Sequence, residues 1–262
     1  STNISGPNLW PTTAPLPAFD ICPPPVNVPE GLPIFHMGDL VIVPEAKTAD
    51  MNSNDDNKSM QQWEYSFSSM DISEEASIIA VGLSDFGNNY GQYGLVRVFA
   101  WACEAKKWNQ LGQDLLGTNP GEAFGYAISS SRDGHVMAVS AIQDQYDDGN
   151  GFVEVYYLND NRWDMLGSRM ENIDFDMDYT GLGTAIDLSD IGETLAVLGV
   201  VGTNSYVTRV FSYDSNDKEW VRKGNDINII VSYADDNIFS PSLILSEDGN
   251  ELALGDPVFG VN

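Results

Sequence analysis

Apolar residues in this chain come in short runs separated by turn residues, a pattern that is typical of β-strands joined by hairpins. Between residues 118 and 175 the runs predict strands at about 124–131, 135–141, 151–158 and 162–168. Asp133-Gly134 joins the first two, and this pair indicates a tight hairpin because glycine accepts the positive φ that such a turn requires. No helical periodicity extends beyond two turns. The pattern therefore predicts an all-β protein.

The same pattern repeats along the chain. Four turn segments (SEEAS, SRDGH, SDIGE and SEDGN) begin at Ser73, Ser131, Ser189 and Ser246, which are 58, 58 and 57 positions apart. Seven positions after each serine lies an alanine between bulky aliphatic residues: Ala80, Ala138, Ala196 and Ala253. A β-rich segment begins at Gly94, Gly151 and Tyr206, and a tryptophan precedes a glycine by four positions at Trp108, Trp163 and Trp220. The small alanine suits a strand pressed between two sheets, and the tryptophan is expected to cover the outer region of each unit.

Four-stranded antiparallel units that repeat about every 57 residues are typical of propeller blades. We therefore expect an all-β fold, a β-propeller or part of one. The blades are expected at about 63–117, 118–175 and 176–232, with an incomplete one at 233–262. A β-sandwich of Greek keys is the alternative. It is less favoured because a sandwich does not need the same residue at the same place in every unit.

The first 62 residues differ from the repeats. Residues 1–33 are predicted to form an extended, proline-rich arm, residues 39–43 one strand, and residues 44–62 a polar loop. The last repeat supplies two strands and no third, which leaves an open sheet edge. One hypothesis is that residues 39–43 pair with the strand at about 250–255 and close a small ring of about four blades. The other is that further segments of a longer polypeptide or assembly complete a larger ring.

The charge balance restricts the partners. The chain has 12 Lys and Arg residues against 39 Asp and Glu residues, a formal net charge of −27. Such a surface repels phosphate backbones and anionic lipid, so we expect no nucleic-acid partner, and basic partners or cations instead. No run of 18 apolar residues is present, so membrane insertion is not expected. The simpler interpretation is that the acidity keeps a secreted protein soluble.

Two cysteines and two glycosylation sequons indicate the cellular compartment in which the protein is found. Cys22 lies in the proline-rich arm and Cys103 in the first repeat, so they can form one disulfide or remain as two buried thiols. A disulfide would attach the arm to the body. Asn3 and Asn57 stand in Asn-X-Ser glycosylation sequons. Together these features predict a secreted or cell-surface protein.

One repeat reads FGYAISSSRDGHVMAVSA, then DDGNGFVEVYYL, then a tryptophan ahead of Leu-Gly. This string resembles the FG-GAP-type propeller repeats of secreted and cell-surface proteins, among which are the integrin α-subunit heads. It is also similar to WD-repeat blades, but those run to about 40–45 residues, so the longer period favours the FG-GAP type. The resemblance covers roughly residues 63–262. Phe124-Gly125 is intact only in the second copy; Leu182-Gly183 and Phe239-Ser240 replace it later, and Gly255-Asp256-Pro257 is what remains of the Gly-Ala-Pro element.

The resemblance implies calcium, because FG-GAP propellers often carry aspartate-rich loops that chelate Ca²⁺, and this cation requires several oxygen ligands on a short turning segment. Two stretches are candidates. One contains Asp174, Asp176 and Asp178, and the other contains Asp144, Asp147, Asp148 and Asn150. The alternative is that both are solvated acidic loops of an acidic protein.

The sequence offers little for catalysis. The only histidines are His36 and His135, and neither has a recurring partner, so nucleophilic sites of the Ser/His/Asp or Cys/His type and a histidine-based zinc site are not expected. The turn segments place glycine directly after aspartate and lack the aromatic residue of sialidase-type boxes. Gly181-Leu182-Gly183 has no third glycine and is no nucleotide loop. These observations predict that the protein is not an enzyme.

We therefore expect a non-catalytic propeller that serves as an adhesion, scaffold or assembly module, since propellers hold loops on a rigid support. Its partner would be a protein or a glycan, and the chain could belong to a larger assembly or filament. The alternative is a carbohydrate-binding or carbohydrate-cleaving propeller of the glycosidase or sialidase kind. A pair of carboxylates that converge at the mouth of the central channel would favour an enzyme.

Overall fold

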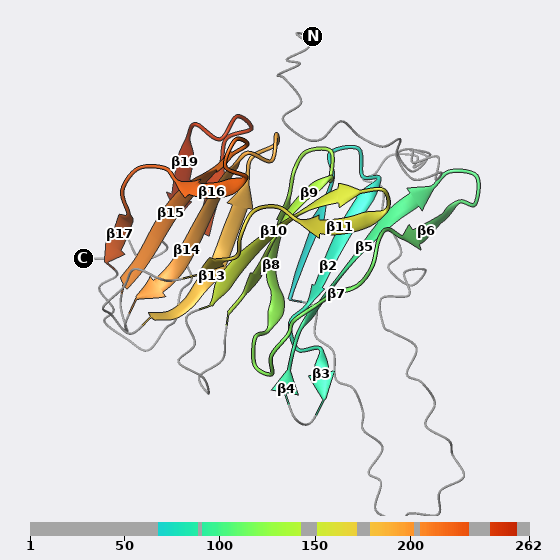
Figure 1. The fold of residues 1–262 in the computed structure, drawn as a ribbon, viewed down its shortest axis with the longest axis horizontal. Coiled ribbons are helices and arrows are strands. Elements are labelled where there is room, and N and C mark those ends of the chain that lie inside the picture. The colour runs from blue at the N-terminus through green and yellow to red at the C-terminus, as the bar shows by residue number, and fades with distance from the viewer. Residues whose placement is uncertain are drawn as a thin grey trace, which may run out of the picture.

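The computed structural model describes residues 68–88, 91–142, 151–171, 179–201, 205–230 and 242–255. These residues form strands and turns with no helix among them, as predicted. Three antiparallel sheets of five strands follow one another along the chain, and a two-stranded sheet comes last (Figure 1). In each five-stranded sheet, four strands form the main path and a short fifth strand pairs with the third.

Each sheet is one blade. Blade 1 consists of β1 (Ser69–Ile72), β2 (Ile78–Leu83), β5 (Leu95–Ala102), β6 (Lys107–Gln110) and β7 (Leu115–Leu116), with the small hairpin of β3 (Gly87–Asn88) and β4 (Gly91–Gln92) inserted. Blade 2 consists of β8 (Phe124–Ser130), β9 (Val136–Ala141), β10 (Phe152–Asn159), β11 (Arg162–Met165) and β12 (Met170–Glu171). Blade 3 consists of β13 (Tyr179–Leu188), β14 (Thr194–Val201), β15 (Ser205–Asp214), β16 (Glu219–Arg222) and β17 (Ile227–Ile230). Blade 4 is represented by β18 (Ser242–Leu245) and β19 (Leu252–Gly255).

The blades stand side by side in an arc, from the cyan β2 to the red β19 in Figure 1. The first strands of successive blades, β1, β8, β13 and β18, pack against one another and form the inner edge of the arc. Sheets that fan out from a common inner edge are the architecture of a β-propeller. The predicted fold class is confirmed, and the four strands predicted for blade 2 agree with the observed ones to within a few residues. The strand expected at residues 39–43 lies outside the described residues, so ring closure stays a prediction.

The hydrophobic core lies between the blades. One cluster joins β2 and β5 of blade 1 to β8, β9 and β10 of blade 2, and a second joins blade 2 to blade 3 in the same way. The repeated alanine of the second strand stands at this contact. Ala80, Ala138 and Ala196 are buried, which confirms the prediction of a small residue between sheets. Ala253 is exposed, because no blade in the described part of the chain packs against the outer face of blade 4.

The repeated tryptophan has a different role from the one expected. Trp163 is 2% exposed and belongs to the cluster between blades 1 and 2, where its Nε1–H donates to the carbonyl oxygen of Leu111 at 2.9 Å. Trp220 donates in the same way to Leu166 of the preceding blade, also at 2.9 Å. The tryptophan therefore does more than cover the outer region of its own blade. It joins that blade to the one before.

The glycine of the tryptophan motif makes this contact possible. A Cβ atom at Gly112 would lie 2.6 Å from Cδ1 of Trp163 in the next blade, closer than real carbon atoms approach. A Cβ at Gly167 would lie 2.9 Å from Cδ1 of Trp220. The glycine that follows the tryptophan of one repeat thus makes room for the tryptophan of the next repeat.

Candidate functional site

The turns between the first and second strands of the four blades meet one another at one end of the inner strands. The backbone N–H of Glu74 donates to the carbonyl of Arg132 at 2.9 Å, that of Arg132 to Asp190 at 2.9 Å, and that of Asp190 to Glu247 at 3.1 Å. These four residues are the second positions of the four repeated turn segments. One backbone contact, repeated at each junction, therefore brings four charged side chains together.

Arg132 lies among three carboxylates that come from the other three blades, and we name these four side chains the Arg132 cluster. Nε and Nη2 of Arg132 donate to the two oxygens of Glu74, at 2.8 Å for Nη2. This bidentate pairing fixes the plane of the guanidinium. Nη1 lies 3.4 Å from Asp190 Oδ2 and 3.6 Å from Glu247 Oε2. These are ion-pair contacts that are longer than a normal hydrogen bond, so Nη1 is held less tightly than Nε and Nη2.

The two nearest carboxylates of the cluster have different acidities. The hydrogen bond from Arg132 lowers the pKa of Glu74. Burial raises the pKa of Asp190; the charge of Arg132 opposes this rise, and repulsion by Glu247 and Glu74 adds to it. Titratable groups whose pKa values are driven apart are typical of sites in which one stays ionised and the other exchanges a proton. The side chains of Arg132 and Asp190 are 47% and 33% exposed, so a small molecule can reach them.

The same turn of blade 2 holds Asp133. Its carboxylate accepts hydrogen bonds from the hydroxyl of Ser131 at 2.7 Å and from the backbone N–H of His135 at 3.0 Å, and the His135 ring lies 3.0 Å away. Burial alone would raise the pKa of Asp133. The hydrogen bonds and charge of His135, together with the Ser131 hydroxyl, outweigh burial and lower the pKa to about 2.

Asp133→Asn is expected to destabilise the protein near neutral pH but not near pH 2. The folded-state pKa lies below the unfolded value of about 3.9, so the ionised carboxylate stabilises the fold above that value. This contribution is lost as the pH falls from about 4 to about 2. The side chain is 64% exposed, and solvent screening limits the expected difference to about 1 kcal/mol. Urea unfolding across this range measures it, with the exposed Glu104→Gln as control. A difference that does not change with pH would contradict the expectation.

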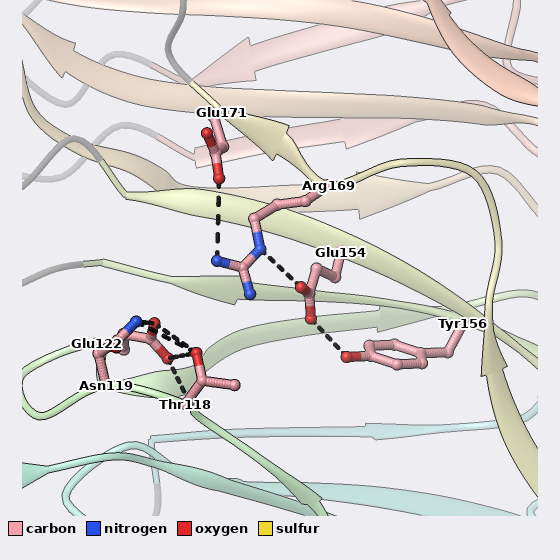
Figure 2. Close-up of polar contacts among 7 residues, drawn as sticks. All are labelled: Thr118, Asn119, Glu122, Glu154, Tyr156, Arg169 and Glu171. Carbon is pink, nitrogen blue, oxygen red and sulfur yellow. Dashed lines mark hydrogen bonds and ion pairs between the residues drawn. The ribbon is translucent and has the colours of Figure 1, made fainter.

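A second polar group is buried where the third strand of blade 2 meets the segment leading to blade 3 (Figure 2). Glu154, 4% exposed, accepts hydrogen bonds from Arg169 Nε at 2.7 Å and from the hydroxyl of Tyr156. The guanidinium of Arg169 stacks on the ring of Phe152 at 3.8 Å, and its Nη1 lies 3.9 Å from Glu171. Burial, followed by the negative charge of Glu154, raises the pKa of Tyr156. All the charges of this group are therefore partnered within the protein.

Figure 2 also shows Glu122, which is 1% exposed. Its carboxylate accepts hydrogen bonds from the backbone N–H of Thr118 at 2.6 Å, the hydroxyl of Thr118 at 3.0 Å and the amide of Asn119 at 2.6 Å. These bonds close the turn that leads from blade 1 into blade 2. The carboxylate of Glu122 therefore accepts hydrogen bonds from the donors of this turn, and it is shielded from solvent.

The pair of Glu154 and its arginine recurs in the neighbouring blades with the charges reversed. In blade 1, Arg97 on the third strand donates from Nε to Asp114 at 2.6 Å, and in blade 3 Arg209 donates to Asp226 at 3.0 Å. Each pair ties a third strand to the segment that leads to the next blade. Because all three blades keep the pair, it is a structural feature of the repeat, and the Arg132 cluster is the better candidate for chemistry.

Several predicted sites lie outside the described residues. These are both candidate calcium loops, with Asp144, Asp147, Asp148 and Asn150 in one and Asp174, Asp176 and Asp178 in the other, and also His36, Asn3 and Asn57. Among the described residues, no group of three or more His, Cys, Asp or Glu side chains is placed to hold a metal ion. Within the same part of the chain, no helix has the length and apolarity that a membrane crossing requires. Calcium binding and glycosylation stay predictions.

Cys103 is disulfide-bonded. Cys22, the other cysteine of the chain, lies outside the described residues, so the pairing of these two stays a prediction.

Sequence reasoning missed both charged groups, although each left a signal in the repeat register. The second position of every turn segment carries a charged residue: Glu74, Arg132, Asp190 and Glu247. A charged residue also interrupts the apolar third strand at Arg97, Glu154 and Arg209. Comparing equivalent positions across the repeats, rather than searching each repeat for a motif, would have found both sets.

No family model matches the chain, and no curated protein matches it in sequence. Solved structures do share its fold. A putative 6-phosphogluconolactonase from Bacteroides fragilis is 14% identical with a TM-score of 0.44, over 76% of this chain and 49% of that one. The periplasmic gluconolactonase of Pseudomonas aeruginosa is 19% identical with a TM-score of 0.45, over 72% and 47%. The β-propeller domain of Cps50 from Myceliophteria thermophila is 7% identical with a TM-score of 0.43, over 74% and 52%. The chain thus spans about half the length of each.

These comparisons correct two expectations. The expectations of a non-catalytic adhesion, scaffold or assembly module and of a protein that is not an enzyme are contradicted by the names of similar solved structures, which include a putative 6-phosphogluconolactonase and a gluconolactonase. The likeness itself shows the fold. The physical reason is that a propeller specifies no function by itself, and a site assembled from several blades leaves no motif in any one of them. The β-propeller part of the resemblance is confirmed, whereas the similar structures do not single out the FG-GAP type.

Proposed function

We propose that the Arg132 cluster hydrolyses a small cyclic ester of the lactone class. The observation that supports this proposal is the position of Arg132 Nη1, 3.4 Å from the carboxylate of Asp190. This carboxylate is partly exposed to solvent, and its pKa is raised. Ester hydrolysis needs a base for the attacking water and a positive group for the oxygen that becomes negative. Asp190 and Arg132 supply these two groups. Carboxylates from three blades also converge on Arg132 at one end of the inner strands.

The proposed reaction uses the cluster as follows. Asp190 accepts a proton from a water molecule, and the oxygen of that water forms a bond to the lactone carbonyl carbon. Nη1 of Arg132 donates hydrogen bonds to the resulting oxyanion, while Glu74 holds the guanidinium in place. When the intermediate collapses, the bond from the carbonyl carbon to the ring oxygen breaks and the ring oxygen takes the proton from Asp190. The product is the open hydroxy acid, which loses its carboxyl proton to solvent.

The test is hydrolysis of glucono-δ-lactone, a lactone of the class in the names of two similar structures. The rate is followed with a pH indicator against a blank without protein. Asp190→Asn is expected to lower kcat/KM by about 10²-fold or more, the usual contribution of a general base. The acid limb of the pH profile is expected above the ordinary aspartate pKa of about 3.9, because Asp190 must be ionised and its pKa is raised.

Glu75→Gln is the matched control, since Glu75 is an exposed carboxylate of the same end that forms no ion pair with Arg132. It is expected to keep the full rate. A wild-type rate equal to the blank, or equal rates for Asp190→Asn and Glu75→Gln, would overturn the proposal and leave the cluster as a contact that holds the blades together.

We further propose that the repeats are of the FG-GAP type and that the protein is secreted or displayed at the cell surface, with a protein or glycan partner. Phe124-Gly125 supports the first statement. The disulfide at Cys103 supports the second, because disulfides persist in oxidising compartments. Calcium at the two aspartate-rich loops remains a proposal, and its test is whether a chelator lowers the melting temperature.

A further inference from the structure

An open pocket of about 550 Å³, called the cavity below, lies along the inner strands of the first three blades. Most of its lining comes from residues three to five positions before the serine of each turn segment, at the start of β1 and in the middle of β8 and β13, whereas the Arg132 cluster lies in the turn segments themselves. Cavities of roughly 300–1,000 Å³ are the usual size for small-molecule sites. The two places are therefore separate, and the hydrolysis proposed above does not use the cavity.

Equivalent residues of the three blades line this cavity. Ser68, Tyr126 and Thr184 each stand five positions before the serine of their turn segment, and all three carry a hydroxyl group. The next position is small in every blade: Ser69, Ala127 and Ala185. The repeat therefore places a hydroxyl-bearing side chain, followed by a small residue, at the equivalent position of each blade along the cavity.

The Phe-Gly and Leu-Gly elements shape this wall. Strand pairing is irregular between Phe124 and Ile128 in β8, and again between Leu182 and Ala185 in β13. A β-bulge of this kind changes the direction of a side chain and is over-represented beside functional sites. The bulges fall on the segments that contain Tyr126 and Thr184, the two residues of these blades that bring hydroxyls to the cavity.

Glycine is required at each bulge. Gly125 and Gly183 have φ values of +87° and +90°, in the region that favours glycine. A Cβ at Gly183 would also lie 2.6 Å from Cβ of Ser140 in the preceding blade. The Phe-Gly and Leu-Gly elements of the sequence thus lie in the bulged segments that carry the lining residues.

The chemistry of the lining restricts the ligand. Hydroxyl groups both donate and accept hydrogen bonds, as a polyhydroxylated ligand requires. The lining contains no Lys, Arg or His, and Asp85 is its one charged residue. An anionic ligand would therefore meet no positive partner, on a chain whose net charge is −27. Ile128 and Ile186 add apolar surface against which the C–H face of a sugar ring can pack.

We infer that this cavity binds a neutral, polyhydroxylated small molecule of the size of a monosaccharide. The equivalent hydroxyl groups of the three blades donate hydrogen bonds to the hydroxyls of the ligand and accept hydrogen bonds from them. The aromatic ring of Tyr126 contacts the apolar face of the ligand. Binding is independent of the Arg132 cluster.

The experiment is saturation-transfer NMR of the whole chain with glucose, galactose and mannose, and with the anion gluconate. At least one neutral sugar is expected to give saturation transfer at concentrations of about 1–10 mM, the range of weak single-ring binding, and gluconate to give much less. Tyr126→Phe removes one hydroxyl and keeps the ring, and it is expected to weaken binding about 10-fold, the effect of one hydrogen bond.

Tyr157→Phe is the matched control, because Tyr157 is a half-buried tyrosine of blade 2 that does not line the cavity. It is expected to bind as the wild type does. Absence of saturation transfer from every neutral sugar, stronger binding of gluconate, or equal binding by the two tyrosine variants would overturn the inference. Lactone hydrolysis by the same variants is expected to be unchanged, so a failure of this inference and a failure of the proposed hydrolysis are distinguishable.

Discussion

Replacing Trp163 with alanine is expected to lower the free energy of unfolding by about 3–5 kcal/mol, the usual cost of truncating a buried tryptophan. The side chain is 2% exposed and fills the core between blades 1 and 2. Its ring packs on Gly112, and its Nε1–H donates to Leu111 at 2.9 Å. The substitution therefore opens a cavity between two blades and leaves a buried carbonyl without its donor.

Chemical denaturation followed by circular dichroism measures this loss. Trp108→Ala is the internal control, because Trp108 stands at the same position of blade 1 and its side chain is partly exposed. A clearly smaller loss is expected there. Equal losses for the two variants would show that the tryptophan stabilises its own blade and that the contact between blades contributes little.

Arg169→Met is expected to destabilise the protein by about 3 kcal/mol, because it leaves Glu154 buried without its positive partner. Glu154 is 4% exposed and retains only the hydroxyl of Tyr156. Methionine keeps much of the length of the arginine side chain, so lost packing is a minor part of the effect.

The double variant Glu154→Gln with Arg169→Met tests this cause. It removes both charges and is expected to be more stable than Arg169→Met alone, because no uncompensated charge remains in the interior. The interaction energy follows from a double-mutant cycle of unfolding free energies. A double variant that is less stable than the single one would mean that packing of Arg169 on Phe152, and not charge, accounts for the loss.

Much of the fold could be predicted because each repeat contains its own turn residues and its own alternation of apolar and polar positions. Asp133-Gly134 marks a hairpin whose glycine has a φ of +71° in the structure. In the first copy, Ala76 replaces that glycine and still adopts a φ of +52°, so the turn is retained even where its best residue is missing. The hydrogen bond of the turn itself is kept, from the Ala76 N–H to the carbonyl of Ser73 at 2.8 Å.

The role of the repeated tryptophan could not be predicted in full. A tryptophan on a fourth strand is equally consistent with covering its own blade and with packing on the preceding one. The bond from Trp220 to Leu166 joins residues 54 positions apart, and no signal within a single repeat reports it. The same limit applies to the Arg132 cluster, because a search for histidine-based motifs cannot detect a group whose four side chains come from four blades.

The amino-acid sequence by itself determined the period of the repeats, the strands within each blade and the hairpins that join them. These features depend on alternation and turn chemistry among residues close in the chain. Only the tertiary structure decided that Arg132 meets Asp190 and that Tyr126 and Thr184 share one cavity. Such contacts join residues about one repeat apart, and they exist only because successive blades pack face to face around a common inner edge.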